Sequence, residues 1–195
     1  MKKPPRTLLD GYERFRSGRY KQDADKYAEL GQGQSPKSMI IACADSRVDP
    51  TTIFDAGPGD LFIVRNVANI VPPCQPLEAS LQGVSAALQF AVESLKVENI
   101  IVLGHAGCGG VSASLSSAKG QPIGDYIAQW VELLSPARDT LPPVADKQTA
   151  LEKAGVQMSL KNLESFPFVT TAIKKKNLRL HGAWFCISSG ELVWL

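Results

Sequence analysis

The chain of 195 residues suits a single domain of ordinary size, and it is long enough to bury a core without help from disulfides. Apolar residues make up 44% of it and charged residues 21%, which excludes the disordered class and classes of extreme charge. The net charge is +2, and the basic run at 174–176 has no aromatic or arginine cluster beside it, so we expect no nucleic-acid partner.

Two features of the chain bear on its compartment. The basic start is not followed by the apolar region of a signal peptide, and no apolar run approaches the ~20 residues of a membrane span. The cysteines at positions 43, 74, 108 and 186 are not clustered as in small secreted proteins, and a reducing compartment would leave them as thiols. We therefore predict a cytoplasmic protein without a membrane partner.

The first part of the chain predicts a helical arm. Within residues 8–20, apolar side chains recur at roughly helical spacing with charged positions between them, namely Leu8, Leu9, Tyr12 and Phe15. Such an amphipathic segment could cover a neighbouring subunit as easily as its own core. We predict that residues 1–30 form a helical arm of one domain spanning 1–195.

Strands and a helix are predicted next. The short apolar runs at 39–43, 61–64 and 99–103 are typical of buried strands. A helix with one buried stripe precedes the last of these runs; its apolar residues are Leu77, Leu81, Val84, Leu88, Ala91 and Leu95. Strand, helix and strand in this order predict a parallel sheet with right-handed crossovers.

The remainder is mostly helical and ends in a hairpin. Between 111 and about 176 the patterns are helical with proline interruptions, and Val156, Leu160 and Leu163 share one face. Residues 179–187 and 191–195 flank a Ser-Ser-Gly turn and predict a hairpin. The expected fold class is thus α/β: a mostly parallel sheet of about five strands flanked by helices, with the last strand antiparallel and an N-terminal helical arm.

Metal-binding side chains follow two of the predicted strands. In a parallel sheet, ligands bind at the carboxyl ends of strands, and Cys43, His105 and Cys108 lie just beyond such ends. Two cysteines and one histidine are a recognised zinc set that leaves the fourth tetrahedral position open. We predict that these three residues hold Zn2+, and that Cys74 and Cys186 are ordinary buried thiols.

Asp45 and Arg47 sharpen this hypothesis. An Asp two residues beyond a metal-binding Cys can reach the inner shell of the ion, and the following Arg can hold its carboxylate in a bidentate pair and keep it ionised. A purely structural zinc site requires neither residue, because a fourth protein ligand would close it.

These residues also carry a family resemblance. Cys-x-Asp-Ser-Arg at 43–47, followed by Gly-His-x-x-Cys-Gly-Gly at 104–110, resembles the β-class carbonic anhydrases. The resemblance covers nearly the whole chain and is weakest from 112 to 165. Its other segments, similar in order and spacing, are 34–37, 59–69, 181–182 and 190–192.

The resemblance implies the reaction and most of the site. The protein would be a zinc-dependent carbonate dehydratase, a lyase that reversibly hydrates carbon dioxide to bicarbonate and a proton. Asp45 would accept a hydrogen bond from the attacking group, or become a fourth ligand and shut the site, while Arg47 anchors Asp45. The implied catalytic residues are thus Asp45 and Arg47, and the implied substrate-binding residues are Gln34, Phe62, Val67, Phe90 and Gly109.

The family also implies an assembly and a subgroup. It builds active sites where subunits meet, so we expect a homodimer or an assembly of dimers. Ile40 and Phe185 stand where some members carry the Trp and Tyr that, with an Arg at the place of Arg65, bind a regulatory bicarbonate. Ile and Phe lack those donors. With Gln34, this departure predicts the plant-like, open-site subgroup.

Two other functions fit the same residues. An enzyme of this fold could hydrolyse carbonyl sulfide or carbon disulfide, because the chemistry at the metal is the same. A non-catalytic zinc or redox-sensing protein could use Cys43 and Cys108 only to bind metal or to form a disulfide.

Overall fold

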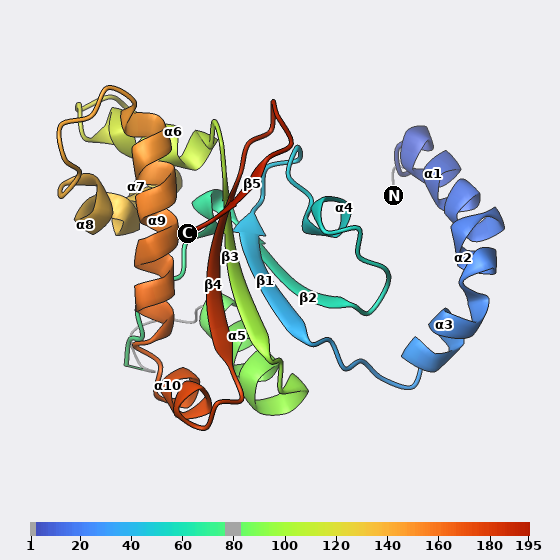
Figure 1. Ribbon diagram of the computed structural model, residues 1–195. Helices are drawn as coiled ribbons and strands as arrows, with labels where there is room; N and C mark the ends of the chain where they lie inside the picture. The colour runs from blue at the N-terminus through green and yellow to red at the C-terminus, as the bar shows by residue number, and fades with distance from the viewer. Residues whose placement is uncertain (1–2, 77–82) are drawn as a thin grey trace. The chain divides into compact units, whose positions relative to one another are not determined.

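The computed structural model of the protein describes residues 3–76 and 83–195, which contain a five-stranded sheet. The strand order is β2-β1-β3-β4-β5 (Figure 1), with the first four strands of that order parallel and β5 antiparallel to β4. The strands are β1 (Ser38–Cys43), β2 (Leu61–Asn66), β3 (Asn99–His105), β4 (Arg179–Phe185) and β5 (Leu192–Trp194).

The register of the strands brings the predicted metal ligands to one edge of the sheet. Cys43, the last residue of β1, pairs with Asn66 at the end of β2. His105, the last residue of β3, pairs with Phe185 at the end of β4. Because these strands are parallel, their carboxyl ends lie together, where α/β proteins bind ligands.

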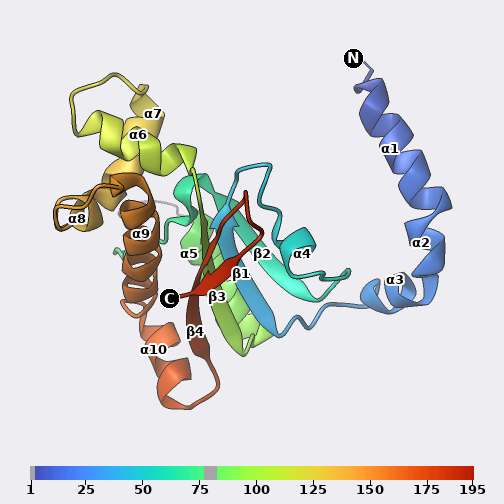
Figure 2. The same ribbon diagram turned by 45° about the horizontal axis from the view of Figure 1, so that its top comes forward.

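Helices connect and cover the strands. Before β3 the chain forms α1 (Arg6–Ser17), α2 (Arg19–Gln22), α3 (Ala24–Leu30), α4 (Pro50–Ile53), η1 (Val67–Asn69), α5 (Gly83–Gln89) and the π-helical η2 (Phe90–Leu95). Between β3 and β4 it forms α6 (Gly109–Ser117), α7 (Asp125–Val131), η3 (Glu132–Leu134), α8 (Ser135–Arg138), α9 (Lys147–Leu163) and α10 (Pro167–Lys174). Helices α6 and α8 both contact α9, and the group is seen in Figure 2.

Polar caps and prolines mark where several helices begin. Asp49 and Asp146 each accept a hydrogen bond from the backbone N–H three residues further on, which satisfies a free donor at the starts of α4 and α9. Pro50 and Pro167 occupy the first turns of α4 and α10, where the missing N–H is not needed.

Each face of the sheet has its own apolar layer. On one face, β1 and β3 pack against α5, η2, α9 and α10 through the buried residues Met39, Ile41, Leu88, Ala91, Ile100, Val102, Val156, Leu163 and Val169. On the other face, a smaller layer of Ile40, Ala42, Ile101, Leu103 and Ala183 packs against Ile53 of α4. Burial of alternate residues on both faces explains the continuous apolar runs of β1 and β3.

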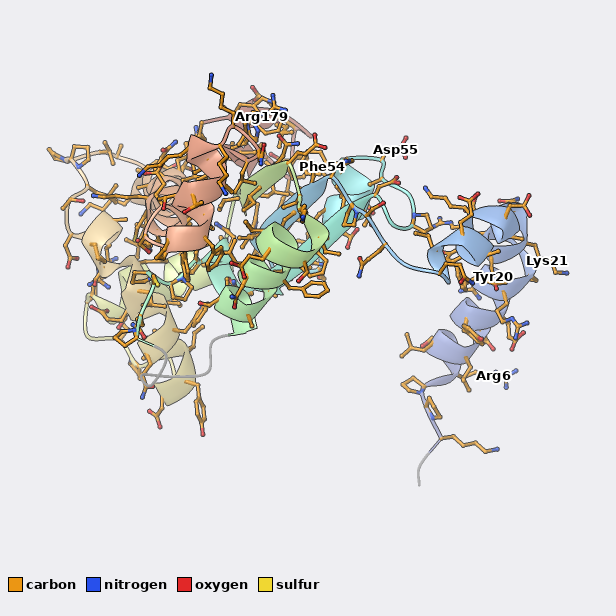
Figure 3. All side chains as sticks on the ribbon, turned by 90° about the horizontal axis from the view of Figure 1, so that it is seen from below. Arg6, Tyr20, Lys21, Phe54, Asp55 and Arg179 are labelled. Carbon is orange, nitrogen blue, oxygen red and sulfur yellow. The ribbon has the colours of Figure 1, made fainter. Side chains whose placement is uncertain are left out.

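The chain divides into two compact units, Met1–Gln34 and Ser35–Leu195. The first unit consists of α1 to α3, and none of the residues in these helices is buried. Phe15, Tyr20 and Tyr27 form an aromatic cluster in it, with the ring centroids of Tyr20 and Tyr27 4.9 Å apart (Tyr20 is labelled in Figure 3). Leu8 is 67% exposed, so the apolar stripe of α1 is unburied.

The structure confirms the predicted fold class. The predicted helix before β3 places Val84, Leu88 and Ala91 in the core, whereas Leu77 and Leu81 lie outside the described residues. That residues 1–30 are an arm of one domain stays a prediction. Among the helices of the described residues, none has both the length and the hydrophobicity of a membrane span.

Two glycines let α9 approach the sheet closely; Figures 1 and 2 show this helix beside β4. A Cβ on Gly104 of β3 would lie 2.7 Å from Val156 Cγ2, and one on Gly182 of β4 would lie 2.9 Å from Leu160 Cδ1. Neither distance is compatible with an added methyl group unless the side chains of α9 or the helix itself shift.

We expect Gly104→Ala to destabilise the fold by about 1–3 kcal/mol, because overpacking displaces α9. Urea unfolding measures this loss. Gly83→Ala is the matched control, since a Cβ on Gly83 meets nothing within 4 Å and should leave the free energy of unfolding unchanged or slightly raised. Equal stability of Gly104→Ala and the unmodified protein would contradict the close approach.

Candidate metal centre

Cys43, His105 and Cys108 come together at the carboxyl edge of the sheet. Cys43 ends β1, His105 ends β3, and Cys108 is the N-cap of α6. Their ligand atoms all lie within 4.8 Å of one another, and the residues are 5%, 1% and 1% exposed. Residues 3–76 and 83–195 contain no second cluster of this kind. The structure therefore brings the three predicted ligands together.

The donor set fits a zinc ion. The Sγ atoms of Cys43 and Cys108 are 3.8 Å apart. Two sulfurs that are each about 2.3 Å from one tetrahedral ion would be about 3.8 Å apart. His105 Nδ1 lies 3.0 Å from the Ala106 carbonyl oxygen, whereas Nε2 is buried and has no hydrogen-bond partner in the described part of the chain. A buried nitrogen without a partner is unfavourable, and a bound ion would supply one.

Close packing moves the pKa values of the three donors apart. The hydrogen bond with Cys108 lowers the pKa of the Cys43 thiol and, with a contribution from His105, outweighs the effect of burial. The same bond, together with burial, raises the pKa of Cys108. Burial opposes protonation of His105, but the negative charge of the neighbouring Cys43 favours it, and the net effect raises the pKa of His105. The cluster thus favours a thiolate on Cys43, the form that binds metal.

Asp45 and Arg47 form the predicted bidentate pair. Arg47 donates from Nε to Asp45 Oδ1 at 2.9 Å and from Nη2 to Oδ2 at 2.7 Å, and its backbone N–H adds a bond of 2.9 Å to Oδ1. Arg47 Nη2 also donates to the Gly107 carbonyl oxygen at 3.2 Å, which ties the pair to the loop before Cys108. These hydrogen bonds from Arg47 hold the pKa of Asp45 well below its usual range.

Arg65 of β2 braces the segment that follows β1. Its Nε donates to the Cys43 carbonyl oxygen at 2.9 Å, and its Nη2 donates to the carbonyl oxygens of Asp45 and Val48 at 2.6 and 3.4 Å. Its Nη1 forms an ion pair of 3.3 Å with Asp49. All three nitrogens of the guanidinium are therefore engaged by the segment that carries Cys43 and Asp45.

Comparison with known proteins identifies the family. The family model described as carbonic anhydrase matches residues 38–192. Beta carbonic anhydrase 3 of Arabidopsis thaliana is 35% identical over 191 residues, which cover 94% of this chain and 73% of that protein. The chain belongs to the β-class carbonic anhydrases. Like its family, it is a zinc-dependent carbonate dehydratase, which hydrates carbon dioxide to bicarbonate and a proton.

Solved structures of β-class carbonic anhydrases share the fold. The β-carbonic anhydrase CcaA matches with a TM-score of 0.86 at 31% identity, over 97% of this chain and 86% of that one. A tetrameric β-carbonic anhydrase of the ascomycete Sordaria macrospora matches with a TM-score of 0.85 at 29% identity, over 97% of this chain and 95% of that one.

Two of the predicted substrate-binding residues of this β-class carbonic anhydrase border the metal centre. Gly109 begins α6 beside Cys108, and a side chain there would meet nothing within 4 Å. Val67 begins η1 and lies against α6, because a Cβ on Gly110 would be 2.5 Å from Val67 Cγ1. The structure therefore places Gly109 and Val67 close to the ligands.

Phe62 and Phe90, two other predicted substrate-binding residues, are not brought to this site. Phe62 precedes Asn66, the β2 partner of Cys43, by four residues, which is about 13 Å along a strand that rises ~3.3 Å per residue. The rings of Phe62 and Phe90 form a pair with centroids 5.9 Å apart, away from the metal ligands of their own chain. Gln34 is exposed and belongs to the first compact unit, so its role stays a prediction.

Three residues that contact the backbone or each other around Cys108 were not predicted: Gln148 and Glu152 of α9, and Trp184 of β4. The sequence held a signal for one of them. Glu152 lies one helical turn before Val156, so it places a carboxylate on a face that Val156, Leu160 and Leu163 mark as apolar.

The remaining cysteines and histidine lie outside the metal centre. Cys74 is exposed and Cys186 is half-buried, so the prediction of two buried thiols is wrong. Both follow regular structure in loops, where the backbone N–H of Cys74 is bonded to Ser165 Oγ at 2.8 Å. His181 Nε2 lies 3.2 Å from Asn99 Oδ1, a contact between strands β4 and β3.

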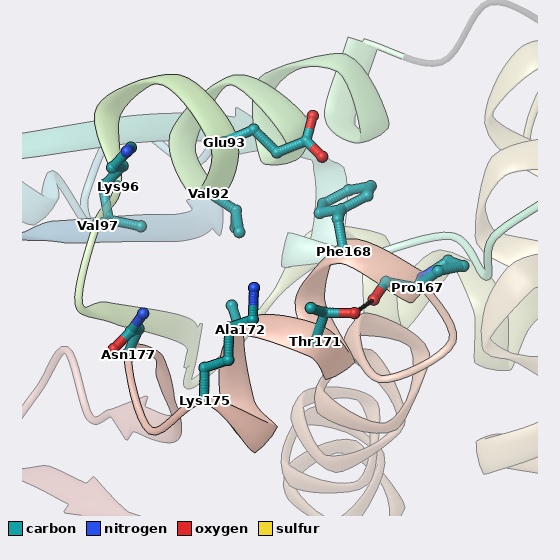
Figure 4. A pocket seen from close by; sticks show the side chains of 10 residues that line it. All are labelled: Val92, Glu93, Lys96, Val97, Pro167, Phe168, Thr171, Ala172, Lys175 and Asn177. Carbon is teal, nitrogen blue, oxygen red and sulfur yellow. Dashed lines mark hydrogen bonds between the residues drawn. The ribbon is translucent and has the colours of Figure 1, made fainter.

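A separate cavity of about 430 Å³ lies between η2 and α10 (Figure 4). Val92 and Phe168 line its apolar part, and Lys96 and Lys175 lie at its margin. Its lining includes the residues just before β3 and β4, so it sits at the amino ends of those strands. The metal ligands occupy the opposite, carboxyl edge, and this cavity is therefore not the active site.

Proposed function

We propose that Cys43, His105 and Cys108 hold the catalytic zinc and that Asp45 and Arg47 orient the reaction beside it. The single observation that carries this proposal is the buried donor cluster with its 3.8 Å sulfur separation and the unpartnered Nε2 of His105. The test is metal analysis of the purified protein together with its turnover of carbon dioxide and carbonyl sulfide, measured side by side. Faster hydrolysis of carbonyl sulfide than hydration of carbon dioxide would reassign the substrate.

The roles of the chain's own residues follow from their contacts. When bound, zinc supplies a Lewis acid that lowers the pKa of a water molecule to about 7 and so provides a nucleophile at neutral pH. Asp45 is held ionised by Arg47 and accepts a hydrogen bond from the nucleophile, which orients it toward the carbon of the substrate. Gly109 leaves room for carbon dioxide, and Val67 gives it an apolar contact.

The same contacts support the plant-like, open-site subgroup. Arg65 is occupied by three carbonyl oxygens and Asp49, and Ile40 and Phe185 have no hydrogen-bond donors in their side chains. A bicarbonate held by this trio would lack partners, each worth about 1 kcal/mol. The bidentate pair with Arg47 meanwhile keeps Asp45 away from the role of a metal ligand.

We expect a crystal structure near pH 7.5 to show Asp45 paired with Arg47 and the fourth zinc position free of protein ligands. Bicarbonate should inhibit without cooperativity, because its regulatory pocket is missing. An Asp45 oxygen bonded to zinc at that pH, or a steep cooperative inhibition curve, would contradict the open-site assignment.

A partner chain would account for the residues that lie away from the metal. Phe62 and Phe90 form an aromatic pair, and Phe90 is 47% exposed, as is suitable for a wall of a neighbouring active site. The exposed apolar stripe of α1 could cover such a neighbour. The related Sordaria macrospora enzymes are tetrameric. We propose a dimer or an assembly of dimers in which Gln34 and Phe62 serve the partner's zinc.

Light scattering after size-exclusion chromatography should therefore give the mass of a dimer or a multiple of it at micromolar concentration. Removal of residues 1–30 should weaken the assembly and reduce activity together. Without its partner, each chain would lack the wall of the active site that the partner's Phe62 and the partner's Phe90 are proposed to form. A fully active monomer would rule out shared sites.

We propose a cytoplasmic location, a reducing compartment in which the four free thiols would stay reduced. Cys43 and Cys108, with sulfurs 3.8 Å apart, are not disulfide-bonded, and the Asp45–Arg47 pair beside them favours catalysis over redox sensing.

A further inference from the structure

Glu152 is a buried carboxylate next to the metal centre that no step above uses. It lies on α9, is 3% exposed, and its two oxygens accept three hydrogen bonds. Oε1 accepts from the Cys108 backbone N–H at 3.0 Å and from Gln148 Nε2 at 2.7 Å. Oε2 accepts from the indole Nε1–H of Trp184 at 3.0 Å.

These bonds fix the peptide groups on both sides of Cys108. Glu152 takes the N–H of Cys108, and Gln148 Nε2 donates to the carbonyl oxygen of Cys108 at 3.0 Å. Helix α9 thereby holds Cys108 from both sides of its Cα atom. The side-chain direction of Cys108 is set by this backbone, so the position of its sulfur depends on α9.

The two hydrogen bonds from Glu152 and Gln148 to the backbone of Cys108, together called the clamp, are needed at this point of the chain. Gly107 has a φ of +65°, and Cys108 is extended, with a ψ of 119°, before α6 begins at Gly109. The N–H of Cys108 therefore has no partner inside α6, and without Glu152 it would be buried and unsatisfied. The base of the clamp is rigid, because α9 lies directly against Gly104 of β3.

A carboxylate suits this place better than any other side chain of its size. All three partners are donors, and only a carboxylate offers acceptor atoms alone on both sides. Glutamine would turn an N–H₂ group toward either Trp184 or Cys108, both of which donate. Among residues 3–76 and 83–195, no cation forms an ion pair with Glu152, so pairing of charges does not explain its burial.

We propose that Glu152 is a positioning residue of the zinc site, which acts through Cys108 to set the affinity and the coordination geometry of the metal. The inference rests on the proposed role of Cys108 as a ligand. Partners of this kind, one step removed from the metal, typically change metal affinity or activity by about 10–100-fold when they are removed. We therefore expect Glu152 to matter for zinc retention itself.

The test compares variants of the full-length protein by two readouts. The first is the zinc dissociation constant, from competition with a chelator. The second is the visible spectrum of the cobalt(II)-substituted protein, whose bands report the geometry around the thiolates. In Glu152→Gln we expect the zinc dissociation constant to rise by about 10–100-fold and the cobalt bands to change.

A second substitution should rescue the first. Trp184→Phe removes the donor that opposes the glutamine amide, so the introduced glutamine can turn its oxygen back to the Cys108 N–H. The double variant Glu152→Gln, Trp184→Phe should therefore bind zinc several-fold more tightly than Glu152→Gln alone. Leu163→Ala is the matched control, because Leu163 is fully buried on the same helix but packs in the core layer away from Cys108. It should lower stability and leave zinc affinity unchanged.

The outcomes separate this inference from its premise. Zinc retained by Cys108→Ser would refute the ligand assignment itself. Zinc lost from Cys108→Ser, but bound by Glu152→Gln within about threefold of the unmodified protein with the same cobalt spectrum, would overturn only the role of Glu152. Equal loss of affinity in Leu163→Ala would overturn it too, as a general effect of instability. If Glu152→Gln does not fold, the half-buried Gln148→Ala decides: weaker zinc binding supports the clamp, and unchanged binding overturns it.

Discussion

Cys43→Ser, His105→Ala and Cys108→Ser are each expected to lose zinc and to reduce carbon dioxide hydration to background. The unmodified protein should carry about one zinc per chain, since the described residues provide one set of three ligands. Two remaining ligands cannot hold the ion against water, and in the two cysteine variants the single remaining thiolate no longer balances its charge. Inductively coupled plasma mass spectrometry of the purified variants measures the zinc, and stopped-flow hydration measures activity.

The chain offers matched controls for these substitutions. Cys74→Ser and His181→Ala change the same residue types outside the metal centre and should retain zinc and activity. Full zinc occupancy in any two of the three ligand variants would contradict the assignment of the site.

Asp45→Asn is expected to lower kcat/KM by about 100-fold while zinc stays bound. The amide cannot accept the hydrogen bonds of Arg47 on both of its atoms, so the group that orients the nucleophile turns away. Asp139→Asn is a matched control, because Asp139 also pairs with a neighbouring arginine but is exposed and lies outside the donor cluster. Unchanged kcat/KM in Asp45→Asn with full zinc would remove Asp45 from the mechanism.

Arg47→Leu extends this prediction to pH. Hydrogen bonding from Arg47 is the largest cause of the lowered pKa of Asp45, so its loss raises that pKa toward the ordinary value of about 3.9. The ionised form is present above the pKa and lost as pH falls through it. The deficit of Arg47→Leu in kcat/KM should therefore grow from about pH 6 to about pH 4. A ratio to the unmodified enzyme that stays constant over that range would contradict the electrostatic role of Arg47.

The metal ligands and the sheet could be predicted because they depend on local patterns. The apolar runs of β1 and β3 are long enough to indicate strands that are buried on both faces, and the chain order indicates parallel pairing. Parallel strands end at one edge, so Cys43 and His105 had to meet there once both strands were recognised.

Other parts of the site depend on tertiary contacts that the patterns do not carry. The distance of Phe62 from Cys43 depends on the register in which β2 pairs with β1, and the sequence pattern does not show this register. The hydrogen bonds of Arg65 depend on the path of the backbone at the end of β1, which directs the carbonyl oxygens of Cys43, Asp45 and Val48 toward it. Glu152 gave a signal as a charge on an apolar face, but its partner Cys108 is brought to it only by the packing of α9 on the sheet.

The most direct test of the central claim is stopped-flow carbon dioxide hydration by the metal-free protein as zinc is added back. A catalytic site made of Cys43, His105 and Cys108 predicts that activity rises in proportion to bound zinc and stops rising at about one zinc per chain. Hydration by the metal-free protein at the full rate, or no acceleration after one zinc per chain has bound, would contradict it.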